Sequence, residues 1–245
     1  MPVRPKISVI FPAFNEEAII LNTLKSLAAQ DVTVPFEVIV VDNNSSDKTS
    51  EVVTNFSKNH PNFRVVFEKR PGIGRARRTG HESALGDIFV GTDADVIHPV
   101  DWLSRIQKEF DQNPKIVGLV GNYVFYDASG FINFLFHINM IVTDFFSRLI
   151  IGNYAFRGNN FAVKSEIYQK SGGFNPHVSA LEDLDLSLRV AKFGKILYRP
   201  SLIVKMTSRR FRGQIIAQTI KRLRAFYYRA IKKDNSQATD WDVIR

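Results

Sequence analysis

The sequence predicts an α/β protein with a mainly parallel sheet flanked by helices. In the first half of the chain, short apolar runs alternate with amphipathic stretches over short connections, as in right-handed βαβ units. Three of the apolar runs end in polar turns that carry carboxylates. Because ligands of parallel sheets bind at the carboxyl ends of the strands, we expect a binding cleft where these turns meet.

Strands are expected where apolar and β-branched residues cluster. The first runs from Ile7 to Phe11 and is ended by Pro12, and residues 36–41 are apolar enough for a central parallel strand. Further strands are expected at residues 63–67, 87–92 and 157–163.

Helices are expected where apolar residues recur on one face or follow N-capping residues. These segments are 16–30, 49–59, 102–110 and 183–193, and a further helix follows the glycine-containing residues 72–80. Residues 131–151 are strongly apolar, but five polar residues among them argue against a transmembrane helix. We expect a buried or interfacial helix there.

The composition is that of a globular protein. The 245 residues are 44% hydrophobic and 23% charged, which suits one large α/β domain with a substantial core. The absence of cysteine excludes disulfides and thiolate chemistry, and it fits a reducing compartment. The first apolar run is too short for a secretory signal. We expect a cytoplasmic protein, either free or bound peripherally to the cytoplasmic face of a membrane.

The net charge of +9 is concentrated near the C-terminus. Residues 1–204 contain 22 Lys and Arg against 21 Asp and Glu, whereas residues 205–233 contain ten Lys and Arg and no acid. We therefore predict a domain at 1–204 and a basic amphipathic tail at 205–245.

Residues 214–233 place apolar side chains on one helical stripe with cations around it, which is typical of a helix on an anionic membrane surface. A helix docked on the domain with a solvated basic rim is the alternative. Arg209, Arg210 and Arg212 extend the basic field, or reach a bound diphosphate. A nucleic-acid partner is not expected, because the cleft is acidic and no nucleic-acid motif is present.

Two carboxylates follow the strand expected at 87–92, in the turn Asp93-Ala94-Asp95. Paired carboxylates suit Mn²⁺ or Mg²⁺, which prefer oxygen ligands and keep positions open for substrate phosphates. Such a cation would neutralise a diphosphate leaving group. Two aspartates in a turn are also common without any metal, so the rest of the chain has to support this interpretation.

Four motifs give that support, and through them the chain resembles the family-two glycosyltransferases. They are VIFPAFNE at residues 9–16, VVDNNSSD at 40–47, TDAD at 92–95 and EDLDLSLR at 182–189. The resemblance implies the GT-A fold, a Rossmann-like sheet that binds a nucleotide-sugar. It also implies that Asp93 and Asp95 hold the metal ion.

The resemblance implies a set of nucleotide-sugar-binding residues. A carboxylate at position 42 suits this role, because it accepts hydrogen bonds from a base imide or a ribose hydroxyl. For Asp47 we favour a role in the turn and in capping the next helix. The residues expected to bind the nucleotide-sugar are Pro12, Ala13, Asn15, Glu16, Asp42, Arg75, Arg77, Thr92 and Asp93.

Arginines at 75, 77 and 78 fall in the segment that resembles the family's stretch closing over the nucleotide. A guanidinium matches the geometry of a diphosphate. Arg77 stands at the family's characteristic arginine position and is the first choice, followed by Arg75. The family usually has asparagine where Arg78 stands, which leaves the role of Arg78 open.

Glu182 and Asp183 are the expected catalytic residues. By the resemblance, Asp183 is the general base of inverting transfer and Glu182 positions the acceptor or the base. The alternative is that both acids only complement the N-terminus of a helix. Residues 157–160 are expected on the sugar or acceptor side of the cleft.

The resulting hypothesis is an inverting, metal-dependent hexosyltransferase. The donor is a nucleoside diphosphate sugar such as GDP-mannose or a UDP-hexose, and the acceptor is a glycan hydroxyl or a polyprenyl-phosphate-type lipid. A nucleotidyltransferase is less favoured, because the glycine-rich, lysine-containing loop expected after its first strand is absent. A degenerate, membrane-recruiting binding module is the other alternative, and the acids at 93, 95 and 183 argue against it.

Overall fold

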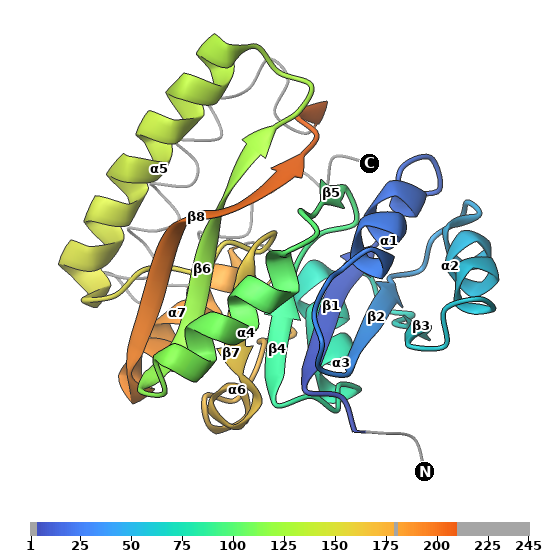
Figure 1. The fold of residues 1–245 in the computed structure, drawn as a ribbon, viewed down its shortest axis with the longest axis horizontal. Helices are drawn as coiled ribbons and strands as arrows, with labels where there is room; N and C mark the ends of the chain where they lie inside the picture. Colours follow the sequence, from blue (N-terminus) through green and yellow to red (C-terminus); the bar gives the residue numbers. More distant parts are fainter. Residues whose placement is uncertain (1–3, 179–180, 210–245) are drawn as a thin grey trace.

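The computed structural model describes residues 4–178 and 181–209, which form one eight-stranded sheet with helices on both faces (Figure 1). The sheet order is β3-β2-β1-β4-β7-β6-β8-β5. The strands are β1 (Ile7–Ala13), β2 (Phe36–Asp42), β3 (Phe63–Phe67), β4 (Ile88–Gly91), β5 (Val96–Ile97), β6 (Ile116–Phe125), β7 (Phe161–Lys164) and β8 (Lys195–Met206). The helices are α1 (Ile20–Ala28), α2 (Thr49–Ser57), α3 (Ile73–Glu82), α4 (Trp102–Gln112), α5 (Gly130–Ile151), α6 (Ser165–Lys170) and α7 (Glu182–Val190), followed by a 3₁₀ turn at Ala191–Phe193.

The sheet has a parallel half and a mixed half. Strands β3, β2, β1 and β4 are parallel, as predicted for the first half of the chain. Beyond β4, β7 runs antiparallel to both β4 and β6, β8 is parallel to β6, and β5 is antiparallel to β8. The predicted α/β sheet with flanking helices is therefore confirmed, with an extension of mixed direction that the sequence did not reveal.

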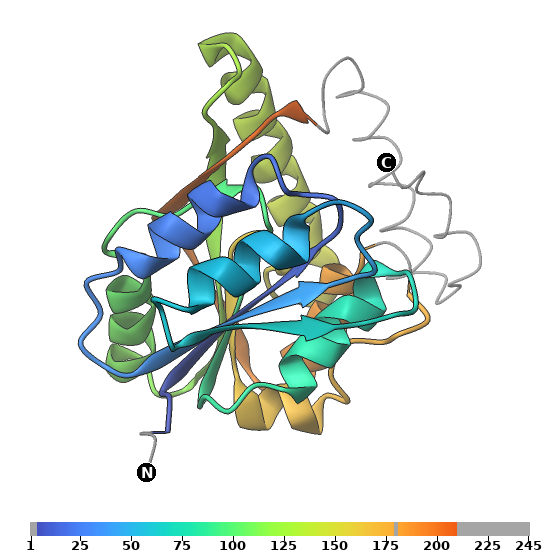
Figure 2. The ribbon, with the colours of Figure 1, turned by 90° about the vertical axis from the view of Figure 1, so that its right-hand side faces the viewer.

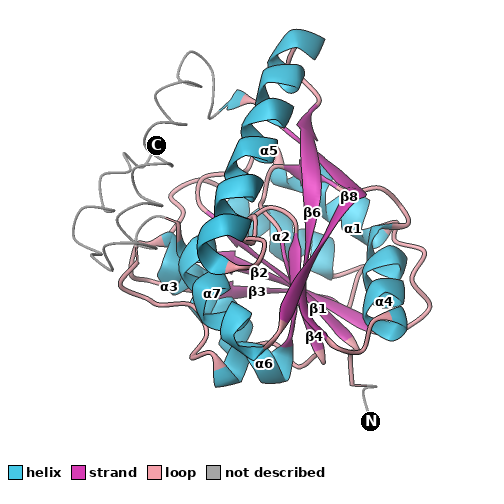
Figure 3. Ribbon diagram, turned by 90° about the vertical axis from the view of Figure 1, so that its left-hand side faces the viewer, coloured by secondary structure: helices cyan, strands magenta, loops and turns pink. Residues whose placement is uncertain are grey.

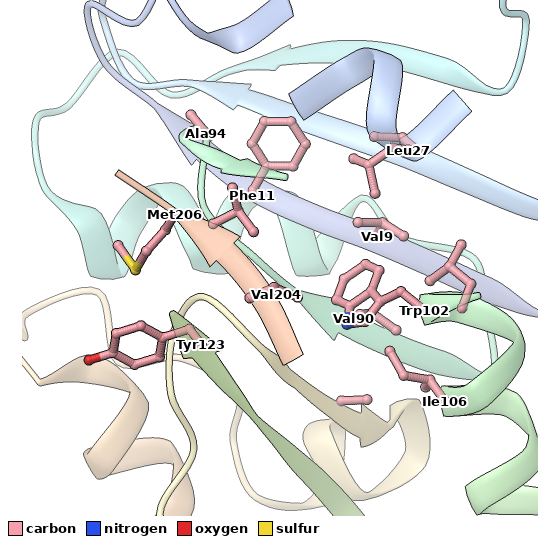
Figure 4. Close-up of a cluster of buried hydrophobic side chains, with 14 of the residues drawn as sticks. Val9, Phe11, Leu27, Val90, Ala94, Trp102, Ile106, Tyr123, Val204 and Met206 are labelled. Carbon is pink, nitrogen blue, oxygen red and sulfur yellow. The ribbon is translucent and has the colours of Figure 1, made fainter. Parts of the chain in front are cut away.

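Alternating side chains along the parallel strands build two cores, one on each face of the sheet. On one face, β1 and β4 pack against α1 and α4, and the fully buried Trp102 lies at the centre (Figure 4). On the other face, Ile10, Ile39 and Phe161 pack against α3, α6 and α7. Figure 2 shows α1 and α2 on one side of the parallel strands and α3 on the other.

Several predicted boundaries differ from the structure, including that of the helix expected to follow residues 72–80, which begins at Ile73. β1 continues through Pro12 to Ala13, because β4 pairs only with residues 7–10 and a missing N–H is tolerated beyond that point. The helix expected from residue 16 begins at Ile20, after a turn. The strand expected from residue 157 begins at Phe161, because residues 157–160 form a turn at the cleft.

Helix α5 runs along β6 and β8 at one end of the sheet (Figure 3). The helix was predicted as buried or interfacial, and the structure excludes the buried alternative, because most of its large apolar side chains are exposed. By length and composition alone, α5 is the one helix among the described residues that could cross a membrane.

The predicted basic helix at 214–233 lies outside the described residues. Strand β8 continues to Met206, two residues past the predicted domain boundary at 204. The division into a domain at 1–204 and a tail at 205–245 stays a prediction.

Candidate active site

The ends of β1 and β2 place two predicted nucleoside-binding residues side by side. Ala13 is the register partner of Asp42, and the N–H of Asn43 donates to the carbonyl of Ala13 at 2.9 Å. The Asp42 carboxylate is buried and accepts hydrogen bonds from the Ser45 N–H, at 2.9 Å, and from the Ser50 hydroxyl. Asp42 is thus held in one orientation by its own turn.

The turn after β1 is fixed by the turn after β2. The Ser46 N–H donates to Asn15 Oδ1 at 2.8 Å, and the Asn15 N–H donates to Ser45 Oγ at 3.1 Å. The Glu16 N–H donates to Thr49 Oγ1 at 2.8 Å. Asn15 has a φ of 53°, a left-handed conformation that asparagine tolerates better than most residues. The predicted residues Pro12, Ala13, Asn15, Glu16 and Asp42 therefore form one rigid double turn.

Asp47 has the contacts of a turn residue. Its carboxylate accepts hydrogen bonds from the Thr49 N–H at 2.9 Å and from the Glu17 N–H at 3.1 Å. Burial opposes ionisation, but the Thr49 and backbone hydrogen bonds outweigh it and lower the pKa of Asp47. These contacts support the predicted role of Asp47 in the turn that starts α2.

Arg77 is the centre of a cluster of acidic side chains. Helix α3 carries its side chain into the interior, where only 1% of it is exposed. Its Nη2 lies 2.7 Å from Asp93 Oδ1, and its Nε lies 3.0 Å from Glu182 Oε1. The same guanidinium donates to the carbonyl oxygens of Thr92, at 3.4 Å, and Gly158, at 3.1 Å. One cation therefore joins α3, the turn after β4, the turn before β7 and the start of α7.

This environment bears on the predicted contact between Arg77 and the donor diphosphate. Burial alone would lower the pKa of Arg77, but the carboxylates around it raise the pKa above its ordinary value, so the cation persists. A Cβ at Gly158 would lie 2.6 Å from Arg77 Nη2, so glycine leaves the space that the guanidinium needs. Most of its N–H donors are directed at protein oxygens, so the structure gives Arg77 a positioning role. Direct phosphate binding stays a prediction.

Glu182 and Asp183 stand at the start of α7, after Leu181 with a φ of 53°. Glu182 is buried, and burial raises its pKa to about 7 against the pull of Arg77, with the neighbouring Asp183 charge adding to the rise. Asp183 Oδ2 accepts a hydrogen bond from the Gly158 N–H at 2.9 Å. Its Oδ1 accepts one from the Leu184 N–H at 2.8 Å, as a helix N-terminus offers. Both acids therefore have fixed positions at the cleft.

The turn that carries Asp93 and Asp95 is supported by a buried histidine that no sequence pattern identified. His98 Nε2 lies 2.9 Å from Thr92 Oγ1, and its Nδ1 lies 3.0 Å from Ser26 Oγ. Its ring packs at a tilt against Trp102, with 4.2 Å between the ring centroids. Burial lowers the pKa of His98 to about 3, so the ring stays neutral. Thr92, predicted to bind the donor, is also held by donating to the Asn159 carbonyl at 3.1 Å.

Asp95 and Glu16 share a cation, Arg209. Arg209 Nη2 donates to Glu16 Oε2, and its Nε lies 3.7 Å from Asp95 Oδ2. Both carboxylates are buried. Among the described residues, no group of three or more His, Asp and Glu side chains is arranged to hold a metal ion. The pair Asp93 and Asp95 nevertheless fits a divalent cation, because carboxylates are the hard oxygen ligands that such a cation prefers. A bound diphosphate would supply further ligands. The Arg209 guanidinium beside Asp95 shows that this position accommodates positive charge.

The two other arginines of the α3 segment lie away from this acid cluster. Arg75 is half-buried in the first turn of α3, and no ion pair of Arg75 is found within the described residues. Arg78 lies 2.7 Å from Glu82 and donates to the Phe174 carbonyl at 3.3 Å. Arg75 remains the predicted second contact to the diphosphate, and Arg78 has a structural role.

The turn at 157–160 joins the acid cluster to α5. Arg157 lies 2.7 Å from each carboxylate oxygen of Asp144 on α5 and donates to the Gly121 carbonyl at 2.7 Å. The next residue, Gly158, binds both Arg77 and Asp183. Asn159 Oδ1 is buried and has no hydrogen-bond donor within the described part of the chain.

The family is decided by comparison with known proteins. Residues 8–178 match the model of glycosyl transferase family 2. The chain is a member of that family. A probable glycosyltransferase, YdaM of Bacillus subtilis, is 32% identical over 212 residues, which cover 79% of this chain and 48% of that protein.

Two further family comparisons bear on ligands. An undecaprenyl-phosphate 4-deoxy-4-formamido-L-arabinose transferase of Photorhabdus laumondii is 31% identical over 117 residues, covering 46% of this chain and 36% of that protein. The structure of a mannosyltransferase from Pyrobaculum calidifontis in complex with GDP-Man and Mn²⁺ superposes with a TM-score of 0.72 at 23% identity, covering 95% of this chain and 66% of that one. The fold is therefore GT-A, as the resemblance implied. The chain spans about half or less of the length of these two sequence relatives.

Proposed function

We propose that this member of glycosyl transferase family 2 is an inverting hexosyltransferase that uses a nucleoside diphosphate sugar. The observation that carries the proposal is the acid cluster around Arg77. It gathers Asp93, Glu182 and Asp183 from distant segments beside the Asp42 double turn, at the carboxyl edge of the parallel strands. The donor is a GDP-mannose-like or UDP-hexose-like molecule, and the acceptor is a hydroxyl or a polyprenyl-phosphate-type carrier.

Each part of the cleft has a distinct role in this reaction. The double turn of Ala13 and Asp42 binds the nucleoside. Asp183 accepts the proton of the acceptor hydroxyl while that oxygen bonds to the anomeric carbon. The bond between that carbon and the diphosphate oxygen breaks, and the nucleoside diphosphate leaves with the electron pair. An acceptor that is already a phosphate needs little help from Asp183.

Mn²⁺ or Mg²⁺ is the proposed cofactor, held by Asp93 and Asp95. When bound, the cation neutralises negative charge on the diphosphate leaving group. The mannosyltransferase of similar fold was solved with GDP-Man and Mn²⁺, which supports this assignment.

The proposed location is cytoplasmic, with peripheral attachment to the cytoplasmic face of a membrane. The undecaprenyl-phosphate specificity in the name of the Photorhabdus laumondii relative supports a lipid-linked acceptor. The basic residues after 204 support an anionic surface as partner.

The donor is identified by a thermal-shift screen of nucleoside diphosphates with and without Mn²⁺, because a ligand that binds the folded state raises the melting temperature. Hydrolysis of the matching nucleotide-sugar, with and without Mn²⁺, then separates an active enzyme from a binding module.

The base assignment is tested with Asp183→Asn, using Asp185→Asn on the same helix as the matched control. Asp185 pairs with Arg189 at 2.6 Å instead of facing Gly158. Transfer to a hydroxyl acceptor should fall by roughly 10²–10⁴-fold in Asp183→Asn, the usual size of a general-base contribution. Nucleoside diphosphate binding should be unchanged, and Asp185→Asn should retain transfer. A full rate in Asp183→Asn would show that the base is another residue.

A further inference from the structure

Helix α5 presents an apolar stripe on its outer side. Large hydrophobic side chains recur every three or four residues along the whole helix, the spacing that places them on one face. At about 1.5 Å per residue, the 22 residues of α5 give a stripe roughly 30 Å long. Contiguous apolar patches of this extent are uncommon on monomeric proteins and mark interaction sites. The exposed residues that define the stripe are Phe131, Phe134, Ile138, Ile141, Phe145 and Leu149.

The inner side of α5 is fixed to the domain. Phe136 and Met140 belong to the core. Asn133 donates to the backbone carbonyl of Phe125 at 3.0 Å and accepts from its N–H at 2.8 Å. The Asp144 carboxylate binds Arg157 through two 2.7 Å contacts. Spanning a bilayer would require α5 to leave these partners and to place charged Asp144 in hydrocarbon, so only the outer side can meet lipid.

Cations flank the stripe at its C-terminal end. Arg148, Lys192 and Lys195 line a hollow of about 610 Å³ beside the end of α5, with the exposed ring of Phe193 at the same place. None of these three cations forms an ion pair with a carboxylate within residues 4–178 and 181–209. They are therefore available to an anionic partner.

Strand β8 leads from the domain into the basic part of the sequence. Strand β8 ends beside Phe125, whose ring packs edge-on against Phe136 of α5 at 4.6 Å. The chain then continues into residues 210–233, which contain eight Lys and Arg and no acid. An apolar stripe flanked by cations at its C-terminal end matches the hydrocarbon boundary and the anionic headgroups of a membrane surface.

We propose that the outer side of α5 docks on an anionic lipid bilayer, lying in the interface with its apolar stripe among the acyl chains. Arg148, Lys192 and Lys195 contact headgroup phosphates. The occupant is a lipid surface and not a second copy of the chain, because neither a second copy nor a neutral protein surface would account for the three cations beside the C-terminal end of the stripe.

This placement has a consequence for catalysis that rests on the proposed function. Asp144, next to Phe145 of the stripe, holds Arg157, and the adjacent Gly158 binds Asp183. A lipid-linked acceptor in the same bilayer would therefore reach Asp183 from the α5 side of the cleft. Docking and chemistry are separable, because docking needs no substrate.

The full chain contains no cysteine, so a single cysteine can be labelled without background. Phe145→Cys, where the native side chain is 63% exposed, would carry an environment-sensitive NBD fluorophore. With vesicles of phosphatidylglycerol and phosphatidylcholine, the emission should shift to the blue and be quenched by nitroxides near the top of the acyl chains. Leu85→Cys, at a position 61% exposed on another part of the surface, is the matched control and should stay unshifted.

Co-sedimentation with the same vesicles measures the energetic contribution of the stripe. The double variant Phe134→Asp with Phe145→Asp should bind at least about tenfold more weakly than wild type, since it removes two large apolar side chains from lipid contact. Phe67→Asp, at an exposed phenylalanine outside the stripe, should bind normally. Thermal shift with a nucleoside diphosphate checks that each variant keeps a folded donor site.

Three results would overturn the proposal. A label at 145 that is already blue-shifted without vesicles would show that another part of the chain covers the stripe. A blue shift that depends on protein concentration alone would identify a second copy as the occupant. Equal binding to pure phosphatidylcholine vesicles would show that the cations do not contribute to docking. Lost transfer activity with intact vesicle binding would instead count against the proposed function.

Discussion

Two groups of carboxylates lie at the carboxyl edge of the sheet, and they are held in different ways. In the double turn, Asp42 is bound by neighbours in its own turn, the Ser45 N–H and the Ser50 hydroxyl. Around Arg77, the carboxylates of Asp93 and Glu182 come from segments far apart in the chain and share one guanidinium. Asp42 is thus held by neutral donors, whereas the two carboxylates bound to Arg77 share a single charge.

The difference determines how each group responds to change. Neutral donors hold one acid without involving its neighbours, so the loss of Asp42 has local effects. Arg77 supplies one positive charge to two bound carboxylates, with Asp183 beside them, so the cluster has excess negative charge when all three are ionised. Burial, together with this excess, raises the pKa of Glu182 to about 7. The cluster therefore behaves as a unit.

The largest effect is expected from Arg77→Met, which should break the cluster. Removing one partner of a buried ion pair leaves charge without compensation and costs roughly 3–5 kcal/mol of stability. Chemical denaturation measures the loss. The matched control is Arg78→Met, because Arg78 pairs with Glu82 at the surface, where such pairs contribute about 1 kcal/mol or less. Equal losses in the two variants would contradict the central role of Arg77.

A second, somewhat smaller effect concerns pH. The folded-state pKa of Glu182 is raised from 4.5 to about 7, so between these values the folded protein binds more protons than the unfolded chain. Stability should therefore fall as pH rises through this window, by on the order of 3 kcal/mol for this one group. Glu182→Gln should remove that part of the slope.

Denaturation curves at several pH values between 4.5 and 7 provide the measurement. Glu166→Gln is the control, because Glu166 is an exposed partner of Lys170 and should leave the slope unchanged. A wild-type slope retained in Glu182→Gln would mean that a different group holds the proton.

The smallest effect is expected from substitutions in the double turn, and it would sharpen the contrast between the double turn and the Arg77 cluster. Asp42→Asn should lower nucleoside diphosphate affinity by about tenfold, the effect of one hydrogen bond to a charged acceptor. Asp47→Asn should cost about 1 kcal/mol of stability through its turn contacts and leave nucleotide affinity unchanged. Isothermal titration with the nucleotide and Mn²⁺ distinguishes them. Equal losses of affinity would show that the two aspartates do not divide these roles.

The sequence predicted the double turn better than the cluster, because the contacts of the turn are local. Asp42 and Ser45 are three residues apart, so the polar run after the strand identified them together. Arg77 and Glu182 are separated by 105 positions, and no periodicity relates them. The resemblance assigned Arg77 to the donor diphosphate and Glu182 to the acceptor or the base, but the burial of Arg77 depends on the space left by Gly158. His98 was missed because its contact with Ser26 likewise joins positions far apart in the sequence.

The second half of the sheet was harder to predict because its strands are irregular. Register shifts in the pairing of β6 with β8 interrupt the alternation that identifies a strand. For α5, hydropathy indicated a helix with polar interruptions. It could not show that Asp144 and Asn133 face the domain while the phenylalanines face outward, because this follows from the position of Arg157 and β6.

Arg209 links the candidate active site to the basic residues that follow it in the sequence. Its guanidinium lies between Glu16 and Asp95, and the basic residues follow it directly in the chain. A ligand that displaces Arg209 from the acids must do work against this contact. Thermodynamic coupling between two binding sites is reciprocal. If a nucleotide–metal complex alters the affinity of the following residues for lipid, then lipid must alter the affinity for nucleotide by the same factor. Comparing nucleotide titrations with and without vesicles would give that factor directly.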